Sequence, residues 1–286
     1  MTAVLCVGLT TVDVVQRVAE FPEPGEKIQS VSVDLVPGGP AANAASAVAA
    51  LGNRAMLLTA LGSDPVADLA KAGLARRGVD VRDVIADTPR GPSLSMVVVR
   101  ERDGERTVVS RNAAEFELPA TVDGLGTLVA QSDVLLLDGH LGPLARLAAH
   151  EAKKADLPVV LDAGSWKPVL HELLPLVDVA ACSSAFSLSE QELHARGVPL
   201  VIRTHGADPV TWSRGASTGE QAVAAVRARD TNGAGDVWHG ALAVAVARGD
   251  GVEDAIRWAN DVAAVRVQNT VGTWVEELER WRQDNG

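Results

Sequence analysis

Short apolar runs recur along the chain and alternate with longer stretches in which apolar residues follow a helical period. The expected strands cover residues 4–7, 55–61, 134–138, 159–162, 177–182 and 200–203. The expected helices cover residues 41–51, 65–77, 143–155 and 237–247. Continuous apolar strands separated by helices are typical of a mainly parallel sheet that helices cover on both faces. The pattern therefore predicts a three-layer α/β fold.

Three further segments alternate between apolar and polar positions, which indicates strands with one face in water. The sequence Asp-Gly-Glu-Arg at 103–106 predicts a hairpin turn between the last two of them. We expect a small antiparallel sheet that projects from the main one as a lid. Its strands are expected at about 12–18, 28–36, 94–100 and 106–112. A sheet of this size is poorly stable by itself in water, so we expect a homodimer that forms through the lid.

Composition and charge exclude several classes of protein. No linker or repeat divides the chain, and residues 1–286 are expected to form a single domain. The chain has 26 Lys+Arg and 37 Asp+Glu, a net charge of −11, whereas nucleic-acid binding needs a basic face. The N-terminus lacks the basic segment of a signal peptide, and no apolar stretch reaches the ~18 residues of a membrane span. Cys6 and Cys182 lie in apolar runs and are expected to be buried, reduced thiols. These features predict a cytoplasmic protein without nucleic-acid or membrane partners.

The first of two glycine-containing segments precedes the helix expected at 41–51. Gly38 and Gly39 allow a ligand to approach the backbone closely, because no Cβ stands in the way. Asn43 lies in the first turn of the helix, where its amide can donate to and accept from hydroxyl groups. The alternative is that the glycines form only a loop and that Asn43 is a polar residue at a helix start.

The second segment, residues 230–236, reads Asp-Thr-Asn-Gly-Ala-Gly-Asp and opens the helix expected at 237–247. A Gly-Ala-Gly turn at a helix start directs several backbone N–H groups to one place, which suits a phosphoryl group. Asp236 is close enough to accept a proton from an attacking hydroxyl. A plain helix cap, worth ~1 kcal/mol, would explain Asp236 but not the glycines. The sequence has no Walker A motif and no G-x-G-x-x-G dinucleotide motif.

Together the two segments resemble the signatures of the ribokinase (PfkB-type) family of carbohydrate kinases. Residues 38–52, GGPAANAASAVAALG, are similar to its N-terminal signature, and residues 230–236 to its D-T-x-G-A-G-D motif. The similarity runs from residue 4 to about 275, and residues 235–249 lean toward the ketohexokinase-like and sulfofructose-kinase-like branches. The resemblance implies a Rossmann-like α/β domain with a β-sheet lid that often forms a dimer interface.

The resemblance also implies roles for single residues in the reaction. Asp236 corresponds to the catalytic base that activates the sugar hydroxyl. The backbone of Gly233, Ala234 and Gly235 corresponds to the anion hole. Positions that hold sugar hydroxyls correspond to Asp13, Gly39 and Asn43.

The cofactors that the resemblance implies are ATP, Mg²⁺ and, in potassium-activated members, K⁺. Positions that line the nucleotide correspond to Thr204, Gly206 and Asn260. Positions that help to bind a monovalent cation correspond to Asp230 and Asn232.

The chain departs from the family pattern in three places. The N-x-x-E motif, which organises the magnesium-water shell, would fall at residues 183–186, which read Ser-Ser-Ala-Phe. Magnesium is therefore expected to rest mainly on the ATP phosphates. Pro209 interrupts the T-x-G-x-x-G pattern near the nucleotide, and Pro40 stands where ketohexokinases carry Asn.

Further residues are candidates for substrate contacts. Asp138 and His140 follow a predicted strand at the edge where ligands of open α/β sheets bind. Arg111 ends a lid strand, before Asn112, and either binds an anionic sugar or is a solvated strand end.

The sequence thus predicts an ATP-dependent kinase of a small neutral sugar, such as ribose, fructose or a related sugar. An anionic sugar is left open. A nucleoside kinase and a catalytically silent sugar- or nucleotide-binding sensor are the alternatives.

Overall fold

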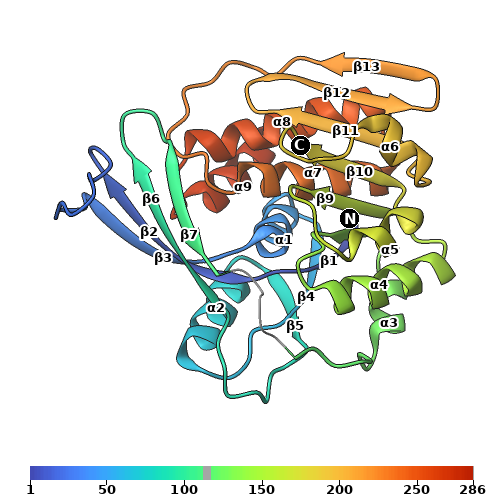
Figure 1. The fold of residues 1–286 in the computed structure, drawn as a ribbon, viewed down its shortest axis with the longest axis horizontal. Helices are drawn as coiled ribbons and strands as arrows, with labels where there is room; N and C mark the ends of the chain where they lie inside the picture. Colours follow the sequence, from blue (N-terminus) through green and yellow to red (C-terminus); the bar gives the residue numbers. More distant parts are fainter. Residues whose placement is uncertain (112–116, 286) are drawn as a thin grey trace.

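The computed structural model describes residues 1–111 and 117–285, and within them a nine-stranded sheet forms the centre of the molecule (Figure 1). Its strands are β1 (Ala3–Val7), β4 (Arg54–Thr59), β5 (Val79–Asp83), β8 (Val134–Leu137), β9 (Val159–Ala163), β10 (Val179–Ser183), β11 (Leu200–His205), β12 (Asp208–Arg214) and β13 (Ser217–Gln221). They lie in the order β13-β12-β11-β10-β9-β8-β1-β4-β5. Among the described pairings of this nine-stranded sheet, only those of β12 with β11 and with β13 are antiparallel. The predicted mainly parallel sheet is confirmed.

Helices cover both faces of this sheet, because alternate residues of each buried strand point to opposite sides. Val4 and Cys6 of β1 pack in one apolar cluster with helices α1 (Pro40–Ala50), α7 (Ala234–Arg248), α8 (Val252–Gln268) and α9 (Trp274–Asn285). Leu5 and Val7 pack in the other with α3 (Leu125–Ala130), α4 (Gly142–Lys154), α5 (Leu170–Leu173) and α6 (Glu190–Ala195). Helix α2 (Pro65–Arg76) packs against β5 and the second sheet.

The second sheet is the predicted lid. Its strands, β2 (Thr11–Val18), β3 (Ser32–Gly38), β6 (Ser93–Arg100) and β7 (Arg106–Ser110), lie in the order β3-β2-β6-β7. Gly104, in the predicted hairpin turn before β7, has a positive φ of 68°.

Two details of the lid prediction are wrong. The sheet is mixed rather than antiparallel, since β2 and β6 are parallel. Their connection includes α1, β4, α2 and β5, which is long enough to reverse the chain. The strand predicted at 28–36 begins only at Ser32, which pairs with Arg17. Val31 still donates its N–H to Arg17 O at 2.7 Å, but β2 ends at Val18, so residues 28–30 extend beyond their partner strand. Asn112, the predicted end of the last lid strand, lies outside the described residues.

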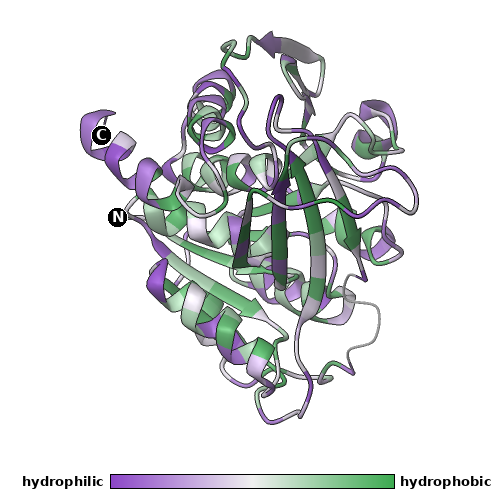
Figure 2. Cartoon of the chain, turned by 90° about the vertical axis from the view of Figure 1, so that its left-hand side faces the viewer, coloured by the Kyte–Doolittle hydropathy of each residue, from purple (hydrophilic) through white to green (hydrophobic). Residues whose placement is uncertain are grey.

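The two faces of the lid differ in their surroundings. The inner face packs Val15, Val97 and Val99 against Val271. On the outer face, one row of apolar side chains crosses all the lid strands, because Val14 pairs with Leu35 and Met96, and Met96 pairs with Val109. Figure 2 looks onto this sheet and shows largely hydrophobic strands facing the viewer. Leu35, Met96 and Val109 are 50%, 45% and 69% exposed.

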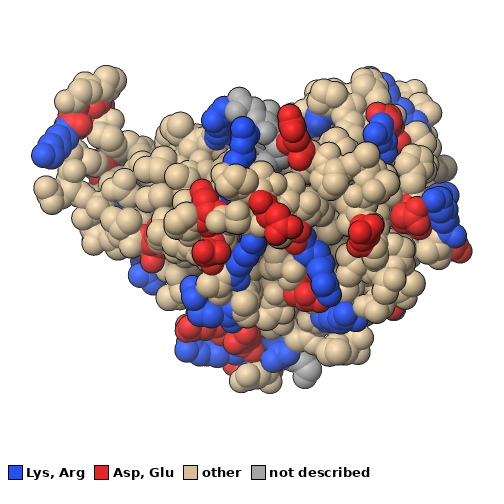
Figure 3. Space-filling model, turned by 90° about the horizontal axis from the view of Figure 1, so that it is seen from below, with Lys and Arg blue, Asp and Glu red and all other residues tan. Residues whose placement is uncertain are grey.

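Several simpler expectations have a direct structural outcome. Cys6 and Cys182 are buried and free, as predicted. No helix within the described ranges is long and apolar enough to cross a membrane. Acidic and basic side chains are interspersed over the face shown in Figure 3, without a large basic patch on that face.

Candidate active site

The first turns of α1 and α7 meet at the candidate base. Asn43, in α1, donates from Nδ2 to Oδ2 of Asp236, in α7, at 2.8 Å. Gly233 caps α7 with a positive φ of 71°, and a Cβ there would lie 3.0 Å from Asn43 Nδ2. The N–H groups of a first helical turn have no intrahelical acceptor and carry the positive end of the helix dipole. The predicted anion hole, Gly233 to Gly235, is therefore next to the carboxylate of Asp236.

A cavity of about 160 Å³ opens beside this pair, between the lid and the two helix starts. The predicted sugar-binding residues, Asp13, Gly39, Asn43 and Asp236, all line it. Further polar side chains in its wall are Thr11, Ser95, Ser110, His140 and Asn232. The structure therefore brings together residues that are more than 200 positions apart in the sequence.

Asp13 is a buried hydrogen-bond acceptor in this cavity. Thr11 Oγ1 donates to its Oδ1 at 2.7 Å. Burial raises the pKa of Asp13, while hydrogen bonds from Thr11, Ser95 and Asn232 oppose the rise. A Cβ at Gly38 would lie 2.1 Å from Asp13 Oδ2, so the glycine is required for this approach of β3 to the carboxylate.

Asp236 has the electrostatic setting of a base. Burial, followed by the nearby negative charge of Asp162, raises the pKa of Asp236 to about 6. The hydrogen bond from Asn43 and the charge of His239 act in the opposite direction. A base with a pKa just below neutrality is ionised at pH 7 and still accepts a proton readily.

Sequence reasoning missed the pair formed by Asp162 and His239. Asp162 lies in β9 and His239 lies one turn after Asp236 in α7, and their Oδ2 and Nδ1 atoms are 3.2 Å apart. Burial lowers the pKa of His239, but Asp162 overcomes this effect and leaves the pKa raised. The sequence feature that could have identified this pair is the position of Asp162 near the end of an apolar strand, which is also the position of Asp138.

Asp138 has a structural role in the described contacts, whereas His140 faces the cavity. Oδ2 of Asp138 accepts from the backbone N–H groups of Leu9 at 2.8 Å and Ala41 at 3.2 Å. The carboxylate thus ties the end of β8 to the loop after β1 and to the start of α1. Burial lowers the pKa of His140, so its imidazole offers a neutral donor and acceptor to the cavity.

The predicted nucleotide residues lie away from this cavity. Thr204 is near the end of β11, and Gly206 follows it in the turn to β12 with a φ of 68°. Asn260, in α8, accepts from Trp238 Nε1 at 2.8 Å and donates to Ala222 O at 3.2 Å. Pro209 lies at the start of β12. No described contact joins these residues, and their shared role stays a prediction.

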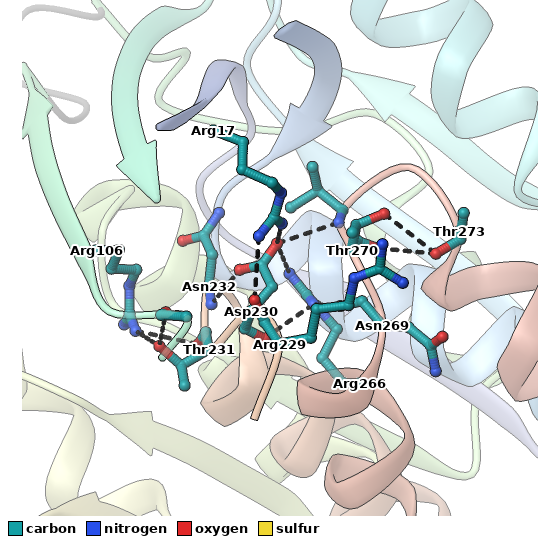
Figure 4. A network of polar contacts seen from close by, with 12 residues as sticks. Arg17, Arg106, Arg229, Asp230, Thr231, Asn232, Arg266, Asn269, Thr270 and Thr273 are labelled. Atoms are coloured by element: carbon teal, nitrogen blue, oxygen red, sulfur yellow. Dashed lines mark hydrogen bonds and ion pairs between the residues drawn. The ribbon is translucent and has the colours of Figure 1, made fainter. Parts of the chain in front are cut away.

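Asp230 is fully buried in a polar network that Figure 4 shows. Its Oδ2 lies 3.4 Å from Arg17 Nη2 and 3.5 Å from Arg266 Nη2. The same oxygen accepts from the N–H of Val271 at 3.2 Å, and Oδ1 accepts from the N–H of Asn232 at 2.9 Å. Neither arginine was singled out from the sequence, because each comes from an element distant from the motif.

Comparison with known proteins identifies the family. The chain matches the pfkB family of carbohydrate kinases over residues 1–185 and 187–273. The chain belongs to this family. It is therefore a phosphotransferase with a sugar hydroxyl as acceptor, and the two segments that meet at Asp236 and Asn43 both lie within the matched residues.

Full-length relatives of this PfkB protein have moderate sequence identity. It is 27% identical to ribokinase from Haemophilus influenzae, with 95% of this chain and 96% of the relative covered. It is 25% identical to mouse ketohexokinase, with 91% and 94% covered. The solved structure of Arabidopsis thaliana ribokinase with ribose and ATP has the same fold, with a TM-score of 0.77, 23% identity, and 98% of this chain and 99% of the other covered.

Proposed function

We propose that the protein transfers the γ-phosphoryl group of ATP to a hydroxyl of a small sugar held in the 160 Å³ cavity. The contact between Asn43 and Asp236 carries this proposal, because it brings a carboxylate, an amide and a helix start to one wall of the cavity. The ATP-bound ribokinase structure and the ribokinase relatives support ATP as the donor.

In this mechanism Asp236 accepts the proton of the attacking hydroxyl. The buried carboxylate is ionised above its pKa of about 6, and Asn43 fixes its orientation through Oδ2. Asp13 accepts hydrogen bonds from other sugar hydroxyls, and Gly39 lets the sugar approach the backbone. The N–H groups of Gly233, Ala234 and Gly235 stabilise the charge on the transferred phosphoryl group.

The residues around 183–186 do not form a site for Mg²⁺. Ser183 Oγ donates to Gly164 O at 2.9 Å, and Phe186 is buried. The described part of the chain also has no group of three or more His, Cys, Asp or Glu side chains placed to hold a metal. We propose that Mg²⁺ arrives with ATP and is held by the phosphates, whose charge it neutralises. Thr204, Gly206 and Asn260 are proposed to line the nucleotide.

The proposal is tested by measuring ADP release with a panel of ketoses, aldoses and nucleosides. Turnover with at least one monosaccharide is expected, because the cavity is small and polar. Turnover with nucleosides alone would show that the acceptor is a nucleoside and not a monosaccharide. Binding of sugar and ATP without turnover would indicate a sensor instead of an enzyme.

An anionic sugar is the second candidate substrate, because a larger, positively lined pocket adjoins the sugar cavity at His140. This pocket of about 600 Å³ is lined by Arg111, Arg146 and Lys167, among others. Glu172 also lines it and pairs with Arg146 at 3.2 Å. Arginine and lysine are suited to phosphate, sulfonate or carboxylate groups.

Arg111→Ala and Lys167→Ala distinguish the neutral from the anionic substrate. A rise in KM confined to anionic sugars would favour the anionic substrate, and an unchanged KM would favour the neutral one. Arg82→Ala, at an exposed arginine outside both pockets, serves as the control.

A further inference from the structure

Two buried arginines converge on the segment that leads into the proposed anion hole. Arg17 comes from lid strand β2 and Arg266 from helix α8, and both place Nη2 beside Oδ2 of Asp230 (Figure 4). The side chains of Arg17, Arg266 and Asp230 are 9%, 2% and 0% exposed. Because an unpaired buried carboxylate is very unfavourable, these guanidinium groups are integral to the conformation of this segment.

The same guanidinium groups also bind backbone carbonyl oxygens around Asp230. Arg17 Nη1 donates to Arg229 O at 3.1 Å. Arg266 Nη1 donates to Asp230 O at 3.2 Å and to Asn269 O at 2.7 Å. Carbonyl oxygens replace the hydration shell of K⁺ where proteins bind it. Here three carbonyl oxygens and a carboxylate oxygen point instead to guanidinium nitrogens.

The lid holds the adjoining residue of the same segment. Arg106, in β7, donates from Nη1 to Thr231 O at 3.1 Å and to Thr231 Oγ1 at 2.8 Å. Thr231 Oγ1 in turn donates to Gly104 O at 3.2 Å. Residues 229–232, which directly precede Gly233, are therefore fixed by α8 on one side and by the lid on the other.

We propose that Arg17 and Arg266 take the place of the monovalent cation that the family resemblance implies at Asp230, so that this kinase orders its anion hole without K⁺. The inference rests on the proposed phosphoryl transfer. Both arginines are positioning residues, since they act on Gly233 through Asp230 and do not line the sugar cavity. A K⁺ ion at Asp230 would be repelled by two fixed positive charges and would find the nearby oxygens already bound.

Thermal unfolding tests cation binding independently of catalysis. The protein is melted in KCl and in choline chloride at equal ionic strength. We expect the wild type to have the same Tm in both salts. Arg266→Ala removes the more buried guanidinium and exposes its oxygen partners, so this variant should have a higher Tm in KCl than in choline chloride. The proposal would be overturned if K⁺ specifically raised the Tm of the wild type, or if K⁺ did not raise the Tm of Arg266→Ala.

Two further variants keep this test decisive. Arg266→Gln retains an amide donor but loses the charge, and it replaces Arg266→Ala if that variant does not fold. Arg257→Ala is the matched control, because Arg257 lies in the same helix but is exposed and pairs only with Asp254 among the described contacts. It should melt identically in both salts.

Turnover provides the second measurement, with the best substrate from the sugar panel. The wild type should have the same kcat in KCl and in choline chloride. Arg266→Ala should lose about tenfold or more in choline chloride, comparable to the loss of a supporting contact at a metal site, and KCl should restore part of it. Failure of the protein to phosphorylate any sugar would contradict the proposed function, whereas the melting experiment would still decide the cation proposal.

Discussion

At the scale of single residues, the proposed chemistry depends on the proton affinity of Asp236, which the neighbouring side chains set. Burial and Asp162 raise its pKa to about 6, and the hydrogen bond from Asn43 limits the rise. Asp236 must be ionised to accept a proton, so activity should fall as the pH drops through this value. Activity falls at low pH because the protonated, inactive form of Asp236 is populated below the pKa.

We therefore expect kcat/KM to rise with pH and to level off above an apparent pKa near 6. Asn43→Ala removes the hydrogen bond that favours the ionised form, so its acid limb should move to higher pH. Arg82→Ala, at an exposed arginine away from the cavity, should leave the limb in place. An unchanged or lowered limb in Asn43→Ala would contradict the assigned role of Asn43.

Sequence reasoning identified the residues that lie within the two glycine segments, together with Asp13 and His140 in the cavity wall, but it missed Asp162, His239, Arg17 and Arg266. Gly39, Asn43 and Asp236 were found because a glycine loop before a helix has a recognisable pattern. Arg17 and Arg266 lie 213 and 36 positions from Asp230 in the chain, and nothing local in the sequence marks them. Their roles follow only from the packing of the lid and α8 around a buried carboxylate.

At the scale of elements, apolar strands were predicted well and polar edge strands were not. The buried strands β1, β8 and β9 lie within one residue of their predicted limits. β13, with the sequence Ser-Thr-Gly-Glu-Gln, has no apolar pattern because it lies at the edge of the sheet. The parallel pairing of β2 with β6 in the lid could not be predicted either, because the alternation of apolar and polar residues does not specify whether the neighbouring strand runs parallel or antiparallel.

The contact between the lid hairpin and the segment before the anion hole gives a prediction at this scale. A Cβ at Gly104 would lie 2.7 Å from the carbonyl carbon of Arg229, and the residue has a positive φ. Gly104→Ala should therefore destabilise the protein and raise the KM for sugar, because the hairpin must move away from residues 229–231.

Gly215→Ala provides the control for Gly104→Ala. Gly215 also has a positive φ, but a Cβ there would meet no atom within 4 Å. Both variants incur the cost of ~1–2 kcal/mol of placing a residue with a Cβ at a positive φ, and Gly104→Ala should lose ~1–3 kcal/mol more from overpacking. Denaturant unfolding measures the difference, and equal stability of the two variants would argue against a tight contact.

At the scale of the whole molecule, the outer face of the lid is the principal exposed apolar surface in the described part of the chain. Val33 and Leu35 of β3, Leu94 and Met96 of β6, and Val109 of β7 are all exposed there. Contiguous exposed apolar patches of this kind mark interaction surfaces. The inner face of the same sheet lines the sugar cavity through Asp13 and Ser95, so a partner on the outer face would stabilise the cavity wall.

We predict that the protein is a homodimer at micromolar concentration and that the outer faces of two lids form the interface. Leu35→Lys and Met96→Lys place a charge in the centre of the apolar row and should give monomers in a sedimentation experiment. Val226→Lys, at an exposed apolar residue outside the lid, should stay dimeric. A monomeric wild type would contradict this interface, although not the role of the lid as a cover.

The most direct test of the proposed reaction is the turnover of Asp236→Asn on the best substrate of the sugar panel. The change keeps the shape of the side chain and removes the charge of a buried carboxylate, so the fold and ATP binding should be preserved. Loss of the general base should lower kcat by ~10²–10⁴-fold, measured as ADP release beside the wild type. A kcat close to that of the wild type would show that Asp236 is not the base.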